Sequence, residues 1–244
     1  MNSRIVIIPT YNEIENIQAI IEKVLSLDPV FDLLIVDDGS PDGTANEVKR
    51  LQALHPTRIH LLERKGKLGL GTAYIAGFKY TLEKGYDYIF EMDADFSHNP
   101  DDLVRLYQAC HEDGAFMAIG SRYINGVNVV NWPMGRVLMS YFAGFYVRFI
   151  TGMPIQDATA GFVCYRRKVL ETIPLDQIKF IGYAFQVEMK FTTWKYGFKI
   201  NEVPIIFTDR TKGTSKMSAN IFKEAIFGVI QLKISSLYKR YQAS

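Results

Sequence analysis

The chain has 244 residues, of which 48% are hydrophobic, so it can bury a full core in one large domain or in one domain with an appendage. The formal net charge of +2 leaves no basic surplus, which excludes a nucleic-acid partner. The two cysteines, Cys110 and Cys164, form neither a disulfide framework nor a Cys/His zinc cluster, and this fits a reducing, intracellular setting.

The first half of the sequence predicts an α/β fold. Short apolar runs at residues 4–10, 32–38, 58–64, 88–95 and 116–123 indicate strands, and each of the first four precedes a helical pattern. Asn12 and Glu15 are expected to cap the first helix, and Asn99 is expected to cap the helix after the fourth strand. The first helix should bury a stripe formed by Ile14, Ile17, Ile20, Ile21, Val24 and Leu25. The alternation favours a Rossmann-like, mostly parallel sheet covered by helices on both faces.

Ligands of such sheets bind at the carboxyl ends of the strands. Polar side chains follow all five predicted strands there, namely Thr10, Tyr11, Asn12, Asp37, Asp38, Lys65, Lys67, Asp93, Asp95, Ser121 and Arg122. A crevice with acids for a metal and bases for phosphate suits a nucleotide diphosphate bridged by a divalent cation.

The stretch "DAD" at residues 93–95 is the strongest candidate for the metal. In an extended segment, Asp93 and Asp95 share one face while Ala94 points to the other. Because Asn99 already supplies the helix cap, metal binding is favoured over a solvated strand end, with Mg²⁺ or Mn²⁺ as the cofactor. His98 is expected at the surface or in support of the ligands, since a carboxylate site for these metals seldom needs imidazole.

Two loops are ambiguous on their own. The glycines of "GKLGLG" (66–71) follow a strand, but their spacing departs from a dinucleotide fingerprint, so a phosphate-cradling loop between Lys65 and Lys67 is more plausible. Turn chemistry explains residues 39–43 of "VDDGSPDGT", yet it does not explain two acids at the end of an apolar strand. Asp37 and Asp38 point to opposite faces, so at most one of them serves the crevice directly.

The second half is less regular. An aromatic-rich segment at 125–156 precedes a turn, strand and helix start at 157–170, a helix at 184–197, a long strand at 199–210 and a helical segment at 218–241. We expect one domain at 1–217, with a nucleotide-binding half at 1–123 and an acceptor half at 124–217, followed by a helical extension at 218–244. The longest uncharged apolar run outside the N-terminus, 137–147, is shorter than the roughly 20 residues of a membrane span, so no membrane crossing is expected.

Six motifs stand in order along the chain: "PTYNE" (9–13), "VDDGSPDGT" (36–44), "GLGTAYIAGF" (69–78), "MDADFSHNP" (92–100), "GSRY" (120–123) and "DRTKGTSK" (209–216). Together they resemble the polyprenyl-phosphate, or dolichol-phosphate, mannosyltransferases, a family of inverting glycosyltransferases with the GT-A fold. The resemblance implies transfer of mannose from GDP-mannose to a polyprenyl monophosphate with inversion at the anomeric carbon and a divalent metal.

The resemblance also assigns roles by position. Pro9, Tyr11, Glu13, Val36 and Asp38 match contacts to guanosine, and the segment of Asp93, Ala94 and Asp95 matches the nucleotide-metal site, with Asp95 as the most direct ligand. Arg210 and Lys216 match bases that hold the diphosphate, a role that Lys67 would share from its loop. Arg122, Arg136 and Ser140 match the positions that hold the lipid phosphate. Asp93, Asp95, Arg122, Arg210 and Lys216 are the expected catalytic residues.

The acceptor assignment has independent support. Arg136 and Ser140 are four residues apart and share one face of a helix at 136–150, whose length of about 22 Å is too short to span a bilayer. A helix this apolar is either core or lies in a membrane surface, and a lipid acceptor favours the second reading, with Trp132 and Tyr141 at the headgroup level. Some family members end in membrane anchors that are missing here, so we expect peripheral docking on the cytoplasmic face or a separate membrane-anchor protein.

Two alternatives stay open at this point. A related enzyme could use another nucleotide sugar, such as UDP-glucose, on the same kind of lipid. A non-catalytic nucleotide-sugar-binding subunit of a membrane complex is the other, although the clustered charges argue against a site without catalysis. In either enzyme a phosphate monoester carries about 1.5 to 2 negative charges at neutral pH, so its oxygen attacks without a general base.

Overall fold

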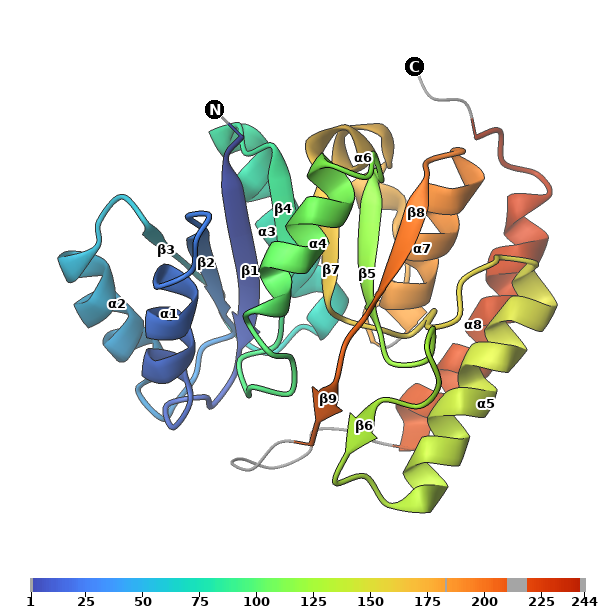
Figure 1. The fold of residues 1–244 in the computed structure, drawn as a ribbon, viewed down its shortest axis with the longest axis horizontal. Coiled ribbons are helices and arrows are strands. Elements are labelled where there is room, and N and C mark those ends of the chain that lie inside the picture. Colours follow the sequence, from blue (N-terminus) through green and yellow to red (C-terminus); the bar gives the residue numbers. More distant parts are fainter. Residues whose placement is uncertain (1, 183, 210–218, 242–244) are drawn as a thin grey trace.

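The computed structural model describes residues 2–182, 184–209 and 219–241 and has an α/β architecture (Figure 1). Its elements, in chain order, are β1 Arg4–Thr10, α1 Ile17–Leu25, β2 Asp32–Asp37, α2 Thr44–Leu54, β3 Ile59–Glu63, α3 Leu70–Lys84, β4 Tyr88–Glu91, α4 Asp102–His111, β5 Met117–Ser121, β6 Val129–Val130, α5 Met134–Thr151, β7 Val163–Arg166, α6 Arg167–Thr172, the 3₁₀ helix η1 Leu175–Gln177, α7 Ala184–Lys195, β8 Ile200–Pro204, β9 Phe207–Thr208 and α8 Ala219–Ser236.

In the described part of the chain, seven strands form one sheet in the order β3-β2-β1-β4-β7-β5-β8. The pairs β3/β2, β2/β1, β1/β4 and β5/β8 are parallel, whereas β7 runs antiparallel to both β4 and β5. This confirms the predicted mostly parallel sheet. The strands that carry the predicted site therefore end at one edge of the sheet, which is the lower edge in Figure 1.

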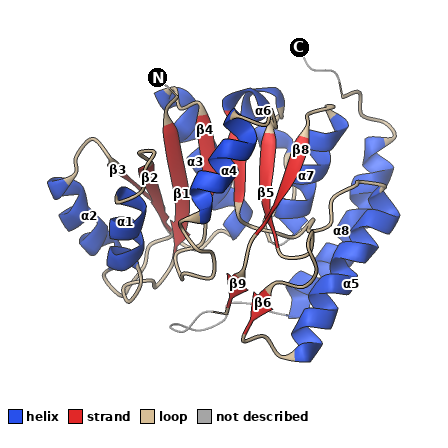
Figure 2. Cartoon of the chain, viewed as in Figure 1, coloured by secondary structure: helices blue, strands red, loops and turns tan. Residues whose placement is uncertain are grey.

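Strand alternation divides the apolar side chains between two layers of helices (Figure 2). Ile5 and Ile7 of β1 face the layer that includes α3, α6 and α7, while Val6 and Ile8 face the layer of α1, α2 and α4. All four side chains are fully buried, and burying each one contributes roughly 1.5 to 3 kcal/mol. The continuous apolar runs of the sequence thus reflect burial on both faces of the sheet.

The starts of α1 and α4 differ from those predicted. The first helix begins at Ile17, because residues 12–16 form a loop in which the Glu13 carbonyl accepts the N–H of Asn16. Asn12 has a φ of 58° and lies outside the helix, so the predicted Asn12/Glu15 capping pair is wrong, and Ile14 is exposed. The cap position of α4 is Asp101, so the predicted Asn99 cap is wrong; the Asn99 side-chain oxygen instead accepts the N–H of Asp101 at 3.1 Å in the turn before the helix.

The predicted long strand at 199–210 is broken in two. β8 pairs with β5 in the large sheet and ends at Pro204, which has no N–H to donate to a further pairing. The chain then joins a separate two-stranded sheet, in which β9 pairs with β6 in parallel. This small sheet lies beyond the carboxyl ends of β1 and β5 (Figure 1).

The helix predicted at 136–150 is α5, and it lies beside α8 (Figure 1). The Tyr146 hydroxyl donates to the Ile226 carbonyl at 2.9 Å, and Lys233 Nζ donates to the Thr151 carbonyl at 3.0 Å. Among the residues that the structure describes, no helix is both long and apolar enough to cross a membrane.

Candidate active site

The loops after β1 and β2 are locked together by side-chain hydrogen bonds. The carboxylate of Asp37 accepts the hydroxyl of Thr10 at 2.9 Å and that of Ser40 at 2.6 Å. The backbone N–H of Glu13 donates to the Thr44 hydroxyl at 3.0 Å. Asp37, the last residue of β2, therefore holds the two loops in place, whereas Asp38 contacts the loop after β3.

Asp38 forms a charged group with residues of the loop after β3. Its carboxylate lies 3.0 Å from Arg64 Nε, and both side chains are buried. Burial raises the pKa of Asp38 above its usual value, although Arg64 and Lys67 act in the opposite direction. Lys67 Nζ stands 5.4 Å from the centre of the Tyr11 ring, so the ends of three adjacent strands meet here.

Arg64 is a residue that the sequence reasoning missed. Its place directly after the third strand, beside Lys65 and Lys67, is the signal that could have found it. The guanidinium also donates to the hydroxyl of Thr72, in the first turn of α3 at 2.8 Å, so Arg64 joins the crevice to that helix.

The remaining predicted guanosine contacts differ in exposure. Pro9 and Val36 are partners in the ladder between β1 and β2. The Val36 side chain is fully buried in the core, whereas Pro9, Tyr11 and Glu13 are partly exposed. Glu13 accepts the side-chain amide of Asn16 at 3.1 Å, which orients its carboxylate within the first loop.

The acid segment at 93–95 lies just beyond β4, which ends at Glu91, so the predicted strand over 88–95 is shorter than expected. Ala94 is buried in the core on the side of α1, α2 and α4. The Asp93 side chain is 42% exposed, while Asp95 is buried and accepts the N–H of Ser97 at 3.0 Å. Glu91, two residues before Asp93, is fully buried.

The carboxylates of Asp93 and Asp95 are the candidate ligands for a divalent cation. Within residues 2–182, 184–209 and 219–241, no group of three or more His, Cys, Asp or Glu side chains is placed to share a metal ion. Mg²⁺ and its substitutes commonly take one or two protein carboxylates and complete their shell with substrate phosphates and water. Asp93 and Asp95 fit that pattern.

His98 packs the acid segment against β9. The imidazole stacks on Phe162 with centroids 4.9 Å apart and meets the edge of Phe207 at 5.2 Å. Its Nδ1 lies 3.9 Å from the Asp93 carboxylate. Burial lowers the pKa of His98 to about 4, so the ring is neutral near pH 7. The side chain is buried beside Asp93, so of the two positions expected for His98, at the surface or in support of the acid segment, the structure agrees with the second.

Arg122 forms a buried pair with Asp157. Nε and Nη2 of the guanidinium contact the two carboxylate oxygens at 2.7 Å each, and Nη2 also donates to the Thr159 hydroxyl at 2.9 Å. Burial raises the pKa of Asp157, but the charge and hydrogen bonds of Arg122 outweigh it, and the pKa ends below its usual value. The pairing identifies Asp157 as the residue that orients Arg122.

Arg136 and Ser140 lie on α5, as predicted, near the small sheet. The Arg136 guanidinium lies 4.0 Å from the centre of the Trp132 ring and donates to Asp209 at 2.8 Å. Trp132 is partly exposed, with its indole Nε1 buried and its ring 5.3 Å from that of Phe207, and its headgroup-level role stays a prediction. Arg210 and Lys216, which were predicted to hold the diphosphate, lie outside the described residues.

A buried polar network beneath the site also escaped prediction. Gln186 donates to Glu91 at 2.6 Å and accepts from Lys190 Nζ at 3.1 Å, and Lys190 further donates to the Ala160 carbonyl at 2.6 Å. Burial raises the pKa of Glu91 to about 7 and lowers that of Lys190 to about 8, although each of the two charges opposes the shift of the other. Gln186 and Lys190 are four residues apart and share one face of the helix, and this spacing of polar residues was the available signal.

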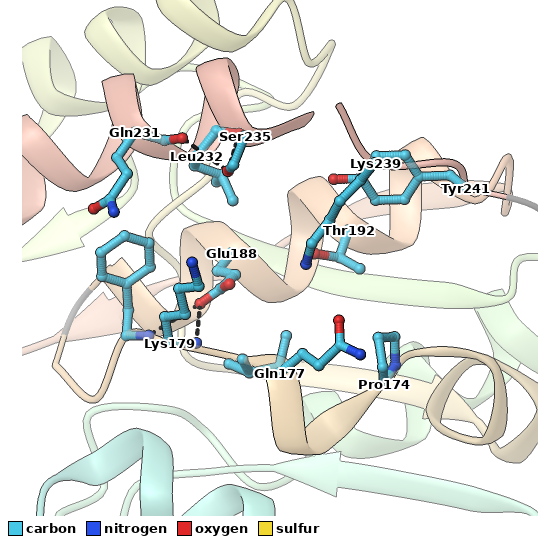
Figure 3. Close-up of a pocket in the computed structure, with 12 residues that line it drawn as sticks. Pro174, Gln177, Lys179, Glu188, Thr192, Gln231, Leu232, Ser235, Lys239 and Tyr241 are labelled. Atoms are coloured by element: carbon cyan, nitrogen blue, oxygen red, sulfur yellow. Dashed lines mark hydrogen bonds between the residues drawn. The ribbon is translucent and has the colours of Figure 1, made fainter. Parts of the chain in front are cut away.

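A second polar group lines a small pocket between η1, α7 and α8 (Figure 3). There Glu188 accepts the backbone N–H groups of Lys179 and Phe180 at 2.9 and 3.0 Å, so it holds the loop before α7. None of the predicted site residues lines this pocket. Glu188 therefore has a structural contact, which agrees with the lack of a catalytic assignment for it.

The mostly parallel sheet, with an acidic pair and basic side chains after its strands, agrees with the GT-A fold of glycosyltransferases. The family model described as "Glycosyl transferase family 2" matches residues 5–174, and the chain belongs to this family.

Two curated relatives narrow the comparison. The chain is 47% identical over 227 residues to the polyprenol monophosphomannose synthase of Mycolicibacterium smegmatis, which covers 93% of this chain and 85% of the relative. It is 44% identical over 237 residues to the undecaprenyl-phosphate mannosyltransferase of Micrococcus luteus, with 97% and 96% covered. The resemblance to polyprenyl-phosphate mannosyltransferases is thereby confirmed.

Solved structures agree with the fold. Glucosyl-3-phosphoglycerate synthase from Mycobacterium tuberculosis, in complex with Mn²⁺, UDP and glucosyl-3-phosphoglycerate, has a TM-score of 0.67 at 17% identity, covering 96% of this chain and 79% of that one. A mannosyltransferase from Pyrobaculum calidifontis in complex with GDP-mannose and Mn²⁺ has a TM-score of 0.56 at 15% identity, with 98% and 75% covered.

Proposed function

We propose that this glycosyltransferase moves mannose from GDP-mannose to a polyprenyl monophosphate, with inversion at the anomeric carbon. The observation that carries the proposal is the position of Arg136. Arg136 lies in the first turn of α5, next to the polar edge of the sheet. The rest of α5 exposes apolar side chains on its outer side. A phosphate on a long hydrocarbon chain needs such a junction. The two relatives that act on polyprenyl-type phosphates support the same choice.

The donor would occupy the crevice between the loops after β1, β2 and β4. Tyr11, Glu13 and Asp38 would bind the nucleoside, and Lys67, with Arg210 and Lys216, would bind the diphosphate. Asp95 and Asp93 would hold Mg²⁺ or Mn²⁺ together with the diphosphate oxygens. When bound, the metal supplies positive charge that stabilises the departing diphosphate.

The acceptor phosphate would bind to Arg136, Ser140 and Arg122. One of its oxygens attacks the anomeric carbon from the side opposite the diphosphate, the new carbon–oxygen bond forms, and the bond to the diphosphate breaks with its electron pair. Because the acceptor is already an anion, no general base is required. Asp157 would contribute by holding the Arg122 guanidinium in one orientation through Nε and Nη2, so that its positive charge stays beside the acceptor site.

The lipid tail would lie along α5. The outer side of this helix exposes Leu138, Phe142, Phe145 and Phe149, and the adjoining α8 exposes Phe227, Ile230 and Ile234. A continuous apolar surface next to a phosphate site suits peripheral docking on a membrane. The cytoplasmic face is the side that offers nucleotide sugars, and a separate membrane-anchor protein would be compatible with this surface.

The metal assignment is tested by Asp95→Ala, with Asp101→Ala as the matched control. Asp101 lies in the same loop region but is exposed and pairs with Lys23 on the surface. We expect Asp95→Ala to lower kcat/KM at least 100-fold, by analogy with the loss of one preorganised electrostatic group, and Asp101→Ala to retain wild-type transfer. Retention of most activity by Asp95→Ala would contradict the assignment.

A further inference from the structure

Asp209 occupies the position where an acceptor phosphate would meet Arg136. Its carboxylate accepts a hydrogen bond from Arg136 Nη1 at 2.8 Å, and its backbone N–H donates to the Val130 carbonyl at 3.0 Å. The small sheet of β6 and β9 therefore fixes the backbone that carries this carboxylate. On the other side, the indole of Trp132 stacks on the same guanidinium at 4.0 Å.

A carboxylate and a phosphate bind the arginine fork in the same way, so they compete for it. The side chains of Arg136 and Asp209 are 34% and 28% exposed, and partly exposed ion pairs of this kind are weak. A phosphate monoester carries more charge and more acceptor oxygens than a carboxylate. The pair is thus strong enough to neutralise Arg136 at rest, yet weak enough for a phosphate to displace.

We propose that Asp209 is a specificity-determining residue that holds the place of the acceptor phosphate on Arg136. This inference rests on the acceptor site given under Proposed function. A polyprenol without a phosphate cannot displace the carboxylate, so Arg136 stays paired and the unphosphorylated lipid is rejected. After transfer, the carboxylate returns to Arg136 and assists the release of the phosphodiester product.

The competition has a defined thermodynamic consequence. The apparent affinity of any ligand that must displace Asp209 is reduced by the fraction of molecules in which Arg136 is free. Removing the carboxylate therefore tightens the binding of acceptor and product by the same factor, roughly two- to fivefold for a partly exposed pair. The affinity for the donor does not change, because Arg136 belongs to the acceptor site.

Trp132 supplies a direct optical reporter. The chain has two tryptophans, Trp132 and Trp194. In a Trp194→Phe background, geranyl phosphate would be titrated without donor while the fluorescence of Trp132 is recorded, with inorganic phosphate in a parallel titration. Asp209→Asn removes the charge at nearly constant shape, Asp209→Glu retains the carboxylate, and Arg136→Ala removes the site.

We expect Asp209→Asn to lower the Kd for geranyl phosphate two- to fivefold, Asp209→Glu to stay near the wild type, and Arg136→Ala to abolish the signal. Inorganic phosphate should bind more weakly than geranyl phosphate but show the same dependence on Asp209. Unchanged or weaker binding by Asp209→Asn would show that the carboxylate positions Arg136 or has no role, and either result overturns the inference.

Failure of the proposed function would give a different experimental result from failure of this inference. If geranyl phosphate binds with the predicted dependence on Asp209, but no mannose is transferred from GDP-mannose, the competition stands and the donor assignment falls. If geranyl phosphate binding is insensitive to Arg136→Ala, or does not occur, both the acceptor site and the role of Asp209 are wrong.

Discussion

At the scale of single residues, His98 connects the acid segment with the acceptor side of the crevice. His98 follows Asp95 by three residues, and its ring is enclosed by Phe162 and Phe207. An imidazole that is neutral when folded, with a pKa of about 4, has a pKa near 6.5 when unfolded. Between these values the unfolded chain binds more protons, so the free energy of unfolding falls as the pH falls from 6.5 towards 4.

His98→Phe should remove this dependence, since a phenyl ring fits between two aromatic rings and does not titrate. Lowering the pH from 7 to 5 should destabilise the wild type by roughly 2 kcal/mol more than the variant, at 1.36 kcal/mol per pH unit below 6.5. Urea unfolding at the two pH values measures the difference. His55→Phe, at an exposed position, serves as the control. Equal pH dependence in His98→Phe and the wild type would refute the assignment.

Single residues also mark the limit of sequence reasoning at the site. Asp93, Asp95 and Asp38 could be identified because each follows an apolar strand, and strand ends meet at one edge of a parallel sheet. Their long-range partners could not. The Arg122–Asp157 pair and the bridge from Glu91 through Gln186 to Lys190 join segments far apart in sequence, and no local pattern specifies which charge meets which.

At the scale of elements, the glycines at the start of α3 serve packing. Gly69 has a φ of 100°, and the N–H of Gly71 donates to the Ile181 carbonyl at 2.9 Å. A Cβ on Gly71 would lie 2.7 Å from the Phe180 carbonyl oxygen and 2.8 Å from the Phe185 ring. The spacing of "GKLGLG" therefore allows the start of α3 to approach the loop before α7, which is a tertiary requirement that the motif alone does not reveal.

Gly71→Ala should destabilise the protein by about 1 to 3 kcal/mol, because the clash involves backbone that must shift. Gly71→Ala should also reduce donor binding, since Lys67 lies in the loop that leads into α3. Gly66→Ala is the matched control, because a Cβ there meets nothing within 4 Å. Thermal unfolding and nucleotide binding measure the two effects. A Gly71→Ala variant as stable as Gly66→Ala would show that the close approach is not required.

Element boundaries followed the sequence less well than element types. Ile14 continues the apolar spacing of α1, yet hydrogen bonds to Ser40 and Thr44 hold residues 12–16 as a loop. The strand predicted at 199–210 is divided because its two parts pair with different partners, β5 and β6. In both cases tertiary contacts outweighed the local pattern. The division of the chain at residues 123 and 217 stays a prediction.

At the scale of the whole molecule, α5 and α8 lie side by side at the end of the sheet opposite α2 (Figure 1), and both helices expose apolar side chains. The parallel sheet was predictable from alternating strands and helices. The pairing of these two helices was not, because both have apolar residues on most of their circumference and periodicity does not specify which face is covered. Phe145 and Phe149 are among the most exposed apolar side chains of this surface.

Phe145→Asp combined with Phe149→Asp should reduce binding to lipid vesicles and transfer to a long-chain acceptor in those vesicles at least tenfold. Two charges in an apolar interface oppose its insertion. Transfer to soluble geranyl phosphate should persist, because Arg136 and Ser140 are unchanged. Leu54→Asp, on α2 and also exposed, is the control for a charge placed elsewhere. Undiminished vesicle binding would show that this surface does not contact the membrane.

The most direct test of the proposed reaction is the transfer of labelled sugar into the organic phase. Purified protein would be incubated with Mg²⁺ or Mn²⁺ and a short polyprenyl phosphate, with GDP-mannose and UDP-glucose compared side by side. We predict mannose in the lipid fraction, lost when a chelator is added, and no glucose. Transfer of glucose alone would correct the donor, whereas no transfer from either donor by protein that still binds the nucleotide would contradict the account.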